Sequence, residues 1–587
     1  MGNQATEIQL LNKELLGKGT PKSLDPAYQQ WLDKNYSTAA ELEKMTQAVE
    51  LFDYQPTVSI ITPVYNTDAS FLEEAIQSVI AQIYPHWQLC LADDASTDSY
   101  VREILERYSD QDSRIQVIYR EQNGHISAAS NSALEIASGE FIALLDHDDL
   151  LAPDALYRVV ELLNQNPSAD MIYSDEDKVD ENYYLSNPFF KPDWCPDSFL
   201  SKMYTCHLGV YRHSVVKEIG GFREGYEGSQ DYDLVLRLSE KTINIFHLPY
   251  ILYHWRLHPN STSLVPASKA YFESASIRAL SDALVRRQEP GRIETLEIDC
   301  YIPRYDIKNH DLVSIIIPSR DLGSTVDKCL NSIFSKTDYP NYEVVFIDNG
   351  STEPKALDVL RYWKEVEEDR FNLYPYDIPF NYSKLNNYAV SKAKGKYLLF
   401  LNNDIEVLKP DWLTAMVEQA QRPSIGAVGA RLLYPDDTIQ HAGVVIGIGG
   451  VAGHSHKHFP AESMGYFRTI QTVNNYSAVT GACLMCRRDV FNAVNGFEEQ
   501  LSVAFNDVDF CLKIFDLNYK NIYLPHVSLY HYESKSRGYE DTPEKQARFQ
   551  REIAFMQAKW ANLIEHDPCY SKHLTKEHQD YRIATNQ

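Results

Sequence analysis

Short apolar runs alternate with amphipathic stretches through the first part of the chain. The apolar runs cover residues 58–63, 87–92, 115–119 and 141–145, and apolar side chains recur at helical spacing over residues 70–81, 100–108 and 126–137. Strands that alternate with helices predict a mostly parallel sheet with helices on both faces. In such a sheet, polar residues at the carboxyl ends of the strands mark the edge where a ligand binds.

The whole pattern occurs twice. VSIITPVYNTD, which begins at Val58, resembles VSIIIPSRDLG, which begins at Val313. LADDAST, GEFIALLDHDD and QDYDLVLRL return in the same order as FIDNGST, GKYLLFLNND and NDVDFCLKI. A period of about 255 residues is far too long for a solenoid repeat. The sequence therefore predicts two copies of one α/β domain.

Helical or interrupted segments flank and separate the two copies. We expect a helical N-terminal segment, a first domain, a helix with a linker, a second domain and a helical C-terminal segment, over residues 1–56, 57–262, 263–311, 312–540 and 541–587. The step Glu289–Gly291 ends the interdomain helix and begins the linker. An apolar stripe over residues 542–563 predicts a C-terminal helix that packs on the protein's own core, with a membrane-surface helix as the alternative.

Each copy places acidic or amide side chains directly after a buried strand. In the first copy, Asp146 and Asp148 are carboxylates at i and i+2 that can face one hard cation beside a phosphate-bearing ligand. The aligned residues of the second copy are Asn402, Asn403 and Asp404, so one carboxylate remains. A single carboxylate together with substrate phosphates can still hold a metal that keeps several waters.

A second acidic motif follows a Gly-Phe turn and opens a predicted helix in each copy. It places Asp231 and Asp507 at the start of the helix, where the helix dipole favours an anion. An ionised carboxylate there can act as a general base toward a hydroxyl group. The alternative is that each aspartate is only the N-cap of its helix. Because the motif is repeated after an aligned acidic turn, we favour the general base.

Histidines and cations close each copy. His258 and His531 follow the last strand, and a neutral imidazole is a plausible further metal ligand. Arg256 and Arg537 lie close to them in sequence and can meet a diphosphate.

Composition narrows the class of ligand and the compartment. The chain has 587 residues and a net charge of −27, which argues against a protein that tracks nucleic-acid phosphates. The nine cysteines are scattered, and a reducing compartment fits best. The sequence has no apolar run long enough to span a bilayer. We expect a cytoplasmic protein, and leave open a peripheral association with the inner face of the cytoplasmic membrane.

The ordered set PVYN, DDAST, DHDD, GGF and QDYDL resembles the inverting family 2 glycosyltransferases, which have the GT-A fold. The second copy, with NYSKLNN, LFLNND, AVTGAC and FNDVDFCL, is similar to tandem bacterial enzymes of O-antigen or rhamnose-rich polysaccharide assembly. The resemblance implies two GT-A domains that transfer hexosyl or deoxyhexosyl groups, with Mg²⁺ or Mn²⁺ as cofactor. It implies a UDP- or dTDP-linked sugar donor and a lipid-linked or oligosaccharide acceptor, and leaves open an assembly with other polysaccharide biosynthesis proteins.

The resemblance also implies a role for individual residues. Asp231 and Asp507 are the bases, and Asp148, His258, Asp404 and His531 are metal ligands. Asp94 and Asn349 face the nucleotide base. The remaining expected contacts to the nucleotide-sugar are Pro63, Tyr65, Asn66, Asp146, Arg256, Pro318, Arg320, Asn403, Thr480, Gly481 and Arg537.

Two other functions compete with a bifunctional transferase. In one, the first copy alone is catalytic and the second binds the growing glycan or serves as a scaffold, because Asn402 and Asn403 replace the first aspartate and the histidine of the DHDD turn. The other is a sugar-1-phosphate nucleotidyltransferase, which should carry a glycine-rich, basic loop after its first strand. The sequences PVYNTD and PSRDLG do not have that character.

Overall fold

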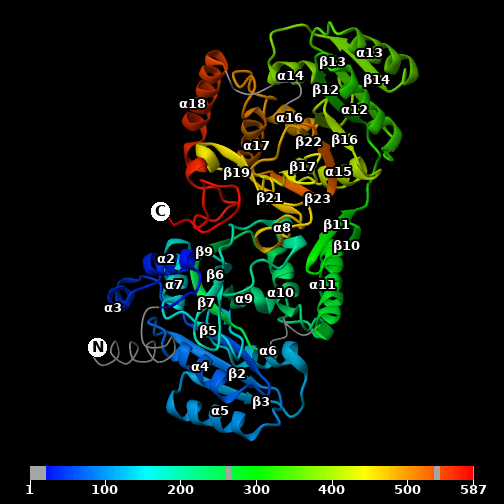
Figure 1. Cartoon of the computed structure of the whole chain (residues 1–587). Coiled ribbons are helices and arrows are strands. Elements are labelled where there is room, and N and C mark those ends of the chain that lie inside the picture. Colours follow the sequence, from blue (N-terminus) through cyan, green and yellow to red (C-terminus); the bar gives the residue numbers. More distant parts are fainter. Residues whose placement is uncertain (1–20, 259–265, 534–541, 586–587) are drawn as a thin grey trace. The chain divides into compact units, whose positions relative to one another are not determined.

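The structure is a computed structural model that describes residues 21–258, 266–533 and 542–585. The chain forms two compact units (Figure 1). The first unit comprises residues 1–194, 203–288 and 583–587, and the second comprises residues 195–202 and 289–582. The division is not a single cut, because a short piece of the first half of the sequence belongs to the second unit.

The first unit is built on one mixed sheet with the strand order β3-β2-β1-β4-β8-β6-β9-β5, and β7 pairs with β6. Strands β1 to β4 are parallel, as the alternation predicts, whereas β8 runs antiparallel to both β4 and β6. The strands are β1 Val58–Val64, β2 Trp87–Asp93, β3 Ile115–Tyr119, β4 Phe141–Leu144, β5 Leu150–Leu151, β6 Met171–Val179, β7 Leu185–Phe189, β8 Gly209–Arg212 and β9 Ile245–Arg256.

The second unit repeats this sheet position by position, in the order β14-β13-β12-β15-β22-β17-β23-β16. Its strands are β12 Val313–Ser319, β13 Tyr342–Asp348, β14 Phe371–Pro375, β15 Tyr397–Leu401, β16 Ile405–Val407, β17 Ile425–Leu433, β22 Cys483–Arg487 and β23 Lys520–His531. Shorter strands add to it: β18 Ile439–His441 pairs with β17, and β21 Asn474–Tyr476 pairs with β23. The duplication seen in the sequence is therefore a duplication of topology, and the predicted pair of GT-A-like α/β domains is confirmed.

Amphipathic helices connect the strands in both units, because their apolar faces complete the cores beside the sheets. In the first unit they are α4 Ala69–Ile80, α5 Ser99–Gln111, α6 His125–Ile136, α7 Ala155–Gln165, α9 His213–Glu218, α10 Gln230–Ser239 and α11 Pro266–Arg286. In the second they are α12 Gly323–Lys336, α13 Pro354–Val366, α14 Tyr382–Lys392, α15 Trp412–Ala420, α16 Arg488–Ala493 and α17 Asn506–Asp516.

The N-terminal helices α2 (Pro26–Asn35) and α3 (Ala39–Ala48) are part of the first unit. The Tyr28 side chain of α2 is fully buried, and its hydroxyl donates to Asp177 Oδ2 at 2.6 Å. Trp31 packs on Phe190, with ring centroids 4.9 Å apart. This segment thus supports the sheet directly.

Helix α8 (Pro196–Ser201) leaves the β7–β8 connection and belongs to the second unit. There the Asn475 side chain accepts hydrogen bonds from the backbone N–H groups of Asp197, at 2.8 Å, and Ser198, at 3.3 Å. Arg422 forms an ion pair with Asp197 at 2.6 Å. No local signal in the sequence marks this exchange, because its partners lie far along the chain.

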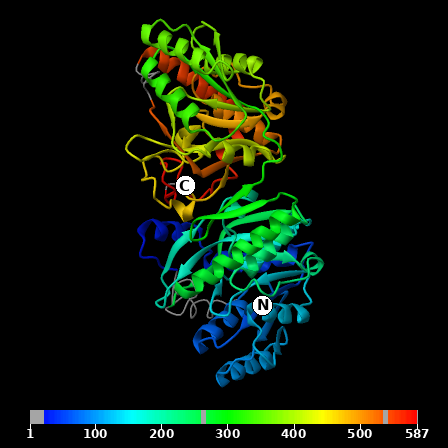
Figure 2. The same ribbon diagram turned by 90° about the vertical axis from the view of Figure 1, so that its right-hand side faces the viewer.

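The segments around the second sheet also differ in part from the expectation. Instead of a linker up to residue 311, β10 (Gly291–Glu297) and β11 (Cys300–Tyr305) form an antiparallel pair. The C-terminal helix α18 (Pro543–Glu565) packs on the second core through the buried Met556 and the partly buried Ile553, Trp560, Leu563 and Ile564. Figure 2, like Figure 1, shows this orange-red helix against the second unit. The predicted docking of the stripe on the protein's own core is confirmed.

Candidate active sites

The acidic turn after β4 is braced by the end of β9. Asp149 is buried and accepts hydrogen bonds from the Tyr253 hydroxyl at 2.6 Å and from the Arg256 backbone N–H at 2.7 Å. The Arg256 guanidinium donates to the Asp148 carbonyl oxygen at 2.7 Å and pairs with Glu74 at 2.6 Å. Arg256 is 2% exposed. It therefore shapes the turn, instead of projecting freely toward a diphosphate as its place in the sequence suggests.

Each unit brings one histidine onto the last aspartate of its turn. His258 Nε2 lies 2.9 Å from Asp148 Oδ2, and His531 Nε2 lies 3.2 Å from Asp404 Oδ1. Asn403, next to Asp404, is buried and donates to Ser319 Oγ at 2.7 Å, so it holds the end of β12. The two copies thus have an equivalent pair of an aspartate and an imidazole.

The sequence YHW in the first copy resembles YHY in the second, but the histidines of the two motifs occupy strand positions that differ by one residue. Strand pairing places His254 opposite Leu150, whereas His531 lies opposite Ile405, the residue that corresponds to Asp149. A shift of one residue sends side chains to opposite faces of a strand. His254 accordingly points away from the acidic turn and lies 2.6 Å from Asp177 Oδ1. The imidazole beside the first acidic turn therefore comes from His258.

The donor atoms suit a divalent cation that a ligand completes. The buried Asp404 Oδ1 approaches His531 Nε2 at 3.2 Å without forming a hydrogen bond, and His531 Nδ1 has no hydrogen-bond partner among the described residues. The described part of the chain contains no cluster of three or more His, Cys, Asp or Glu side chains arranged around a metal position. Mg²⁺ characteristically binds one or two protein ligands together with phosphate oxygens and waters. A carboxylate with an imidazole in each unit fits that requirement.

The proposed bases lie in the first turn of their helices and are not N-caps. Helix α10 begins at Gln230 with Ser229 as its N-cap, and α17 begins at Asn506 with Phe505 as its N-cap. The N-cap alternative is therefore wrong for Asp231 and Asp507. Burial raises the pKa of both carboxyls above the usual aspartate value. A raised pKa strengthens the conjugate carboxylate as a proton acceptor.

The two aspartates are held differently. Asp231 accepts a hydrogen bond from the Tyr232 N–H at 2.8 Å, within its own helix. Asp507 Oδ2 accepts from the Gly481 N–H at 2.7 Å and from the Thr480 hydroxyl at 3.3 Å. Thr480 and Gly481, expected as contacts to the sugar nucleotide, thus lie at the second site and orient its proposed base.

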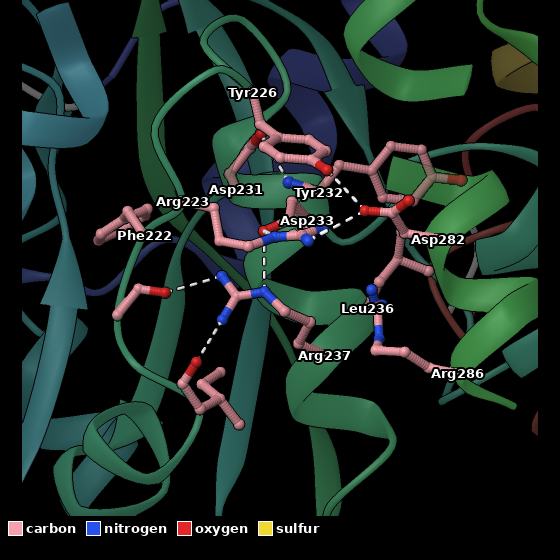
Figure 3. Close-up of polar contacts among 12 residues, drawn as sticks. Phe222, Arg223, Tyr226, Asp231, Tyr232, Asp233, Leu236, Arg237, Asp282 and Arg286 are labelled. Atoms are coloured by element: carbon pink, nitrogen blue, oxygen red, sulfur yellow. Dashed lines mark hydrogen bonds and ion pairs between the residues drawn. The ribbon is translucent and has the colours of Figure 1, made fainter. Parts of the chain in front are cut away.

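The second aspartate of each motif anchors the helix that carries the proposed base. Asp233 is fully buried and binds Arg223 and Arg237, and Arg223 also pairs with Asp282 of α11 at 2.9 Å (Figure 3). Its counterpart is the fully buried Asp509. That carboxylate binds Lys559 at 2.7 Å and the Trp560 indole N–H at 2.9 Å, both from α18. Sequence reasoning missed this role, although the spacing QDYD/NDVD contained its signal.

Residues that follow β1 and β12 organise the neighbouring loops. The Asn66 side chain accepts hydrogen bonds from the backbone N–H groups of Thr97, at 2.8 Å, and Asp98, at 3.4 Å. Tyr65 is 44% exposed. Pro63 and Pro318 lie within β1 and β12, and Arg320 is largely exposed, with Nε 3.9 Å from Asp321. Tyr65 and Arg320 are therefore accessible at this edge, and their contact with a nucleotide stays a prediction.

The residues expected to face the nucleotide base are buried and already paired. Asp94 forms an ion pair with Arg120 at 2.7 Å and accepts from the Gly124 N–H at 2.9 Å. The Asn349 amide donates to the carbonyl oxygens of Tyr376 and Ile378 at 2.9 and 2.8 Å. Arg537 lies outside the described residues.

The first site contains a charged group that the sequence reasoning did not single out. His207 lies 3.4 Å from Glu176 and 4.0 Å from Asp146. Although burial opposes it, the hydrogen bond and charge of Glu176, with the charges of Asp146 and Asp149, raise the pKa of His207 to about 9. The cation lowers the pKa of Asp231, against the larger effect of burial. No motif-level signal marks His207, because the second copy has a different residue there.

Comparisons with known proteins agree with the duplication. The sequence model described as glycosyl transferase family 2 matches residues 59–220 and 314–494, which together exceed half of the 587-residue chain. The chain is similar to uncharacterized protein y4gI of Sinorhizobium fredii (strain NBRC 101917 / NGR234), with 46% identity over 92% of this chain and 60% of that protein. It is also similar to O-antigen biosynthesis protein RfbC of Myxococcus xanthus, with 36% identity over 98% of this chain and 44% of RfbC.

The chain thus spans about half the length of these curated relatives. Among solved structures, it is similar to mannosyltransferase PcManGT from Pyrobaculum calidifontis in complex with GDP-Man and Mn²⁺. The identity is 18%, the TM-score is 0.33, and the match covers 48% of this chain and 75% of that one.

Proposed function

The chain belongs to glycosyl transferase family 2, and on that premise we propose that it is a bifunctional inverting glycosyltransferase. Each unit transfers a hexosyl or deoxyhexosyl group from a UDP- or dTDP-linked donor to a growing surface polysaccharide such as O-antigen. One observation carries the proposal. Each unit has an aspartate–imidazole pair at a strand end and a first-turn aspartate with a raised pKa.

The proposed reaction forms no covalent bond between the sugar and the protein. The acceptor hydroxyl oxygen forms a bond to the anomeric carbon while the bond from that carbon to the diphosphate oxygen breaks. The diphosphate leaves with the electron pair, and the hydroxyl proton moves to Asp231 or Asp507. Attack opposite the leaving group inverts the anomeric centre. Mg²⁺ or Mn²⁺, held by Asp148 and His258 or by Asp404 and His531, would supply positive charge for the diphosphate.

The acceptor in this proposal is a lipid-linked or free oligosaccharide. The name of the Myxococcus relative supports the polysaccharide class. The described residues contain no helix that is long and apolar enough to cross a membrane. We propose that contact with a lipid-linked acceptor uses peripheral association at the inner face of the cytoplasmic membrane, alone or with other polysaccharide biosynthesis proteins.

A second candidate function is a single active site in the first unit, with the second unit as a glycan-binding module or scaffold. Two features favour it. Asn402 and Asn403 replace residues of the acidic turn, and Oδ2 of Asp507 already accepts two hydrogen bonds. The bifunctional proposal is preferred because Asp404 and His531 keep the pairing seen in the first unit.

The test is a screen of UDP-, dTDP- and GDP-linked sugars with the full chain and Mn²⁺, measuring release of nucleoside diphosphate with and without oligosaccharide acceptors. Acceptor-stimulated release from at least one donor is expected. The absence of both hydrolysis and transfer across all donors would contradict the proposal. The full chain is needed because α8 of the first half of the sequence belongs to the second unit.

A further inference from the structure

His207 stands on a buried scaffold that fixes its backbone. Lys191 is fully buried, and its ammonium group donates to the carbonyl oxygens of Ser174, Thr205 and His207 at 2.6–2.7 Å. Glu176 Oε2 accepts from the Lys191 ammonium at 3.2 Å and from the His207 backbone N–H at 2.8 Å. The scaffold therefore holds the peptide groups on both sides of the His207 side chain.

The ring of His207 is oriented as well. It stacks on the Tyr253 ring with centroids 4.5 Å apart and an interplanar angle of 15°. Nδ1 lies 3.4 Å from Glu176 Oε2, and Nε2 lies 4.0 Å from Asp146 Oδ2. The second distance exceeds hydrogen-bond range, so Nε2 is not bonded to Asp146. The side chain is 20% exposed.

In the second unit, apolar residues occupy the positions of His207 and Glu176. Pairing with β4 and β15 makes Arg212 equivalent to Arg487, and counting back equally along the chain places Ala482 at the position of His207. Pairing of β6 and β17 with the same neighbours places Leu432 at the position of Glu176. A buried lysine–glutamate pair is costly to desolvate and does not by itself stabilise a fold. Its presence in one unit calls for a role at that site.

The charges around the ring indicate what it meets. Asp146, Asp148 and Asp231 give the first site an acidic lining, and Arg256, the cation expected there, is occupied by Glu74 and the Asp148 carbonyl. A further hydrogen-bond donor for an incoming diphosphate, beyond the charge of the proposed metal, would therefore come from another element. His207 is 4.0 Å from Asp146 of the metal-site turn, and its charge also acts on the proposed base Asp231.

We propose that His207 contacts the diphosphate of the nucleotide-sugar through Nε2 at the first site, and that Ala482 leaves the second site without this contact. The inference rests on the proposed function, since it assigns a residue to the donor of that reaction. Glu176 and Lys191 are positioning residues that act through His207.

The experiment measures UDP, GDP and dTDP binding by calorimetry in the presence of Mn²⁺, using the full chain in an Asp404→Ala background that weakens the second site. His207→Ala should weaken binding of the preferred diphosphate on the order of tenfold or more, the usual size for a lost hydrogen bond to a charged group. His207→Gln, which keeps a donor, should lose less. The exposed His86 gives the matched control His86→Ala, which should bind like the parent.

Parental affinity in a folded His207→Ala variant would overturn the inference while leaving the proposed function in place. If His207→Ala fails to fold, the nucleotide affinity of His207→Gln is compared with that of the control His86→Gln. A loss of affinity that is equal in the two variants, or no loss in His207→Gln, would overturn the inference. If the parent binds no nucleoside diphosphate with Mn²⁺, the proposed function and the inference both fail.

Discussion

The two units share every strand position of their main sheets but surround the proposed base with different chemistry. In the first unit, His207 on its Glu176–Lys191 scaffold provides a cation near Asp231. In the second unit, neutral donors from Thr480 and Gly481 hold Asp507. The two units thus have the same sheet, acidic turn and base helix, but the residues that surround the proposed base differ.

The second unit adds its own support through a buried histidine. The Thr480 N–H donates to His441 Nε2 at 3.2 Å, and His441 Nδ1 lies 2.9 Å from the Ala430 carbonyl oxygen. The carbonyl requires a proton on Nδ1, so Nε2 is the acceptor. Burial lowers the pKa of His441 to about 4, which keeps this ring neutral. A neutral ring orders the Thr480–Gly481 turn, whereas a cation lies beside the base in the first unit.

The largest expected effect separates the two bases. Asp231→Asn and Asp507→Asn should each slow the transfer of their own unit by about 10²–10⁴-fold, the usual range for losing a general base. The change is nearly isosteric, so donor binding should persist. Steady-state rates with calorimetry check this. Asp516→Asn, an exposed change at the end of α17, is the matched control and should leave the rate unchanged.

The anchors of the base helices should differ in strength. Asp233→Ala leaves the buried Arg237 without its carboxylate, whereas Arg223 keeps its ion pair with Asp282. Breaking a buried ion pair from one side costs about 3–5 kcal/mol. Asp509→Ala should cost less, because its partner Lys559 is one-third exposed and can recover water. Denaturant unfolding of both variants measures the comparison. A smaller loss for Asp233→Ala than for Asp509→Ala would contradict it.

Metal dependence tests whether the two aspartate–imidazole pairs are equivalent. We expect Mn²⁺ or Mg²⁺ to bind through Asp148 only with nucleoside diphosphate present, because the protein supplies few ligands. His258→Ala and His531→Ala should each weaken metal-dependent nucleotide binding about tenfold at their own site. Titration of UDP with and without EDTA measures this. Equal affinity in the two conditions would refute the metal site.

The smallest expected effect is a difference in pH dependence. Each base must be ionised to accept a proton, and burial raises the pKa of both, so each rate should fall on acidification at a pH above the usual aspartate range. His207 lowers the pKa of Asp231 and has no counterpart at Asp507. His207→Ala should therefore move the acid limb of the first transfer upward and leave that of the second transfer unchanged. Identical acid limbs before and after that change would count against the assignment.

Much of the fold followed from the sequence, because periodicity and duplication are local signals. The acids at the ends of β4 and β15, and the histidines beside them, could be placed because parallel strands bring their carboxyl ends to one edge. Nonlocal contacts could not be predicted. Arg256 is bound by Glu74 from a distant helix, and α8 packs in the second unit through Asn475.

Residues specific to one copy were also beyond sequence reasoning. The duplication does not mark His207, because its counterpart in the second copy, Ala482, shares none of its chemistry. The similar sequences YHW and YHY suggest that His254 and His531 are equivalent. They are not, because the strand register separates the two positions by one residue. The repeated motifs therefore identify the residues common to the two sites, but not the residues that distinguish them.

The most direct test of two working active sites is mass spectrometry of the glycan products made by the full chain, by Asp231→Asn, by Asp507→Asn and by the double variant. The account predicts that each single variant stalls the glycan at a different residue and that the double variant adds nothing. If Asp507→Asn gave the parental product while Asp231→Asn removed all transfer, the second unit would not be a catalyst, and the central claim would be contradicted.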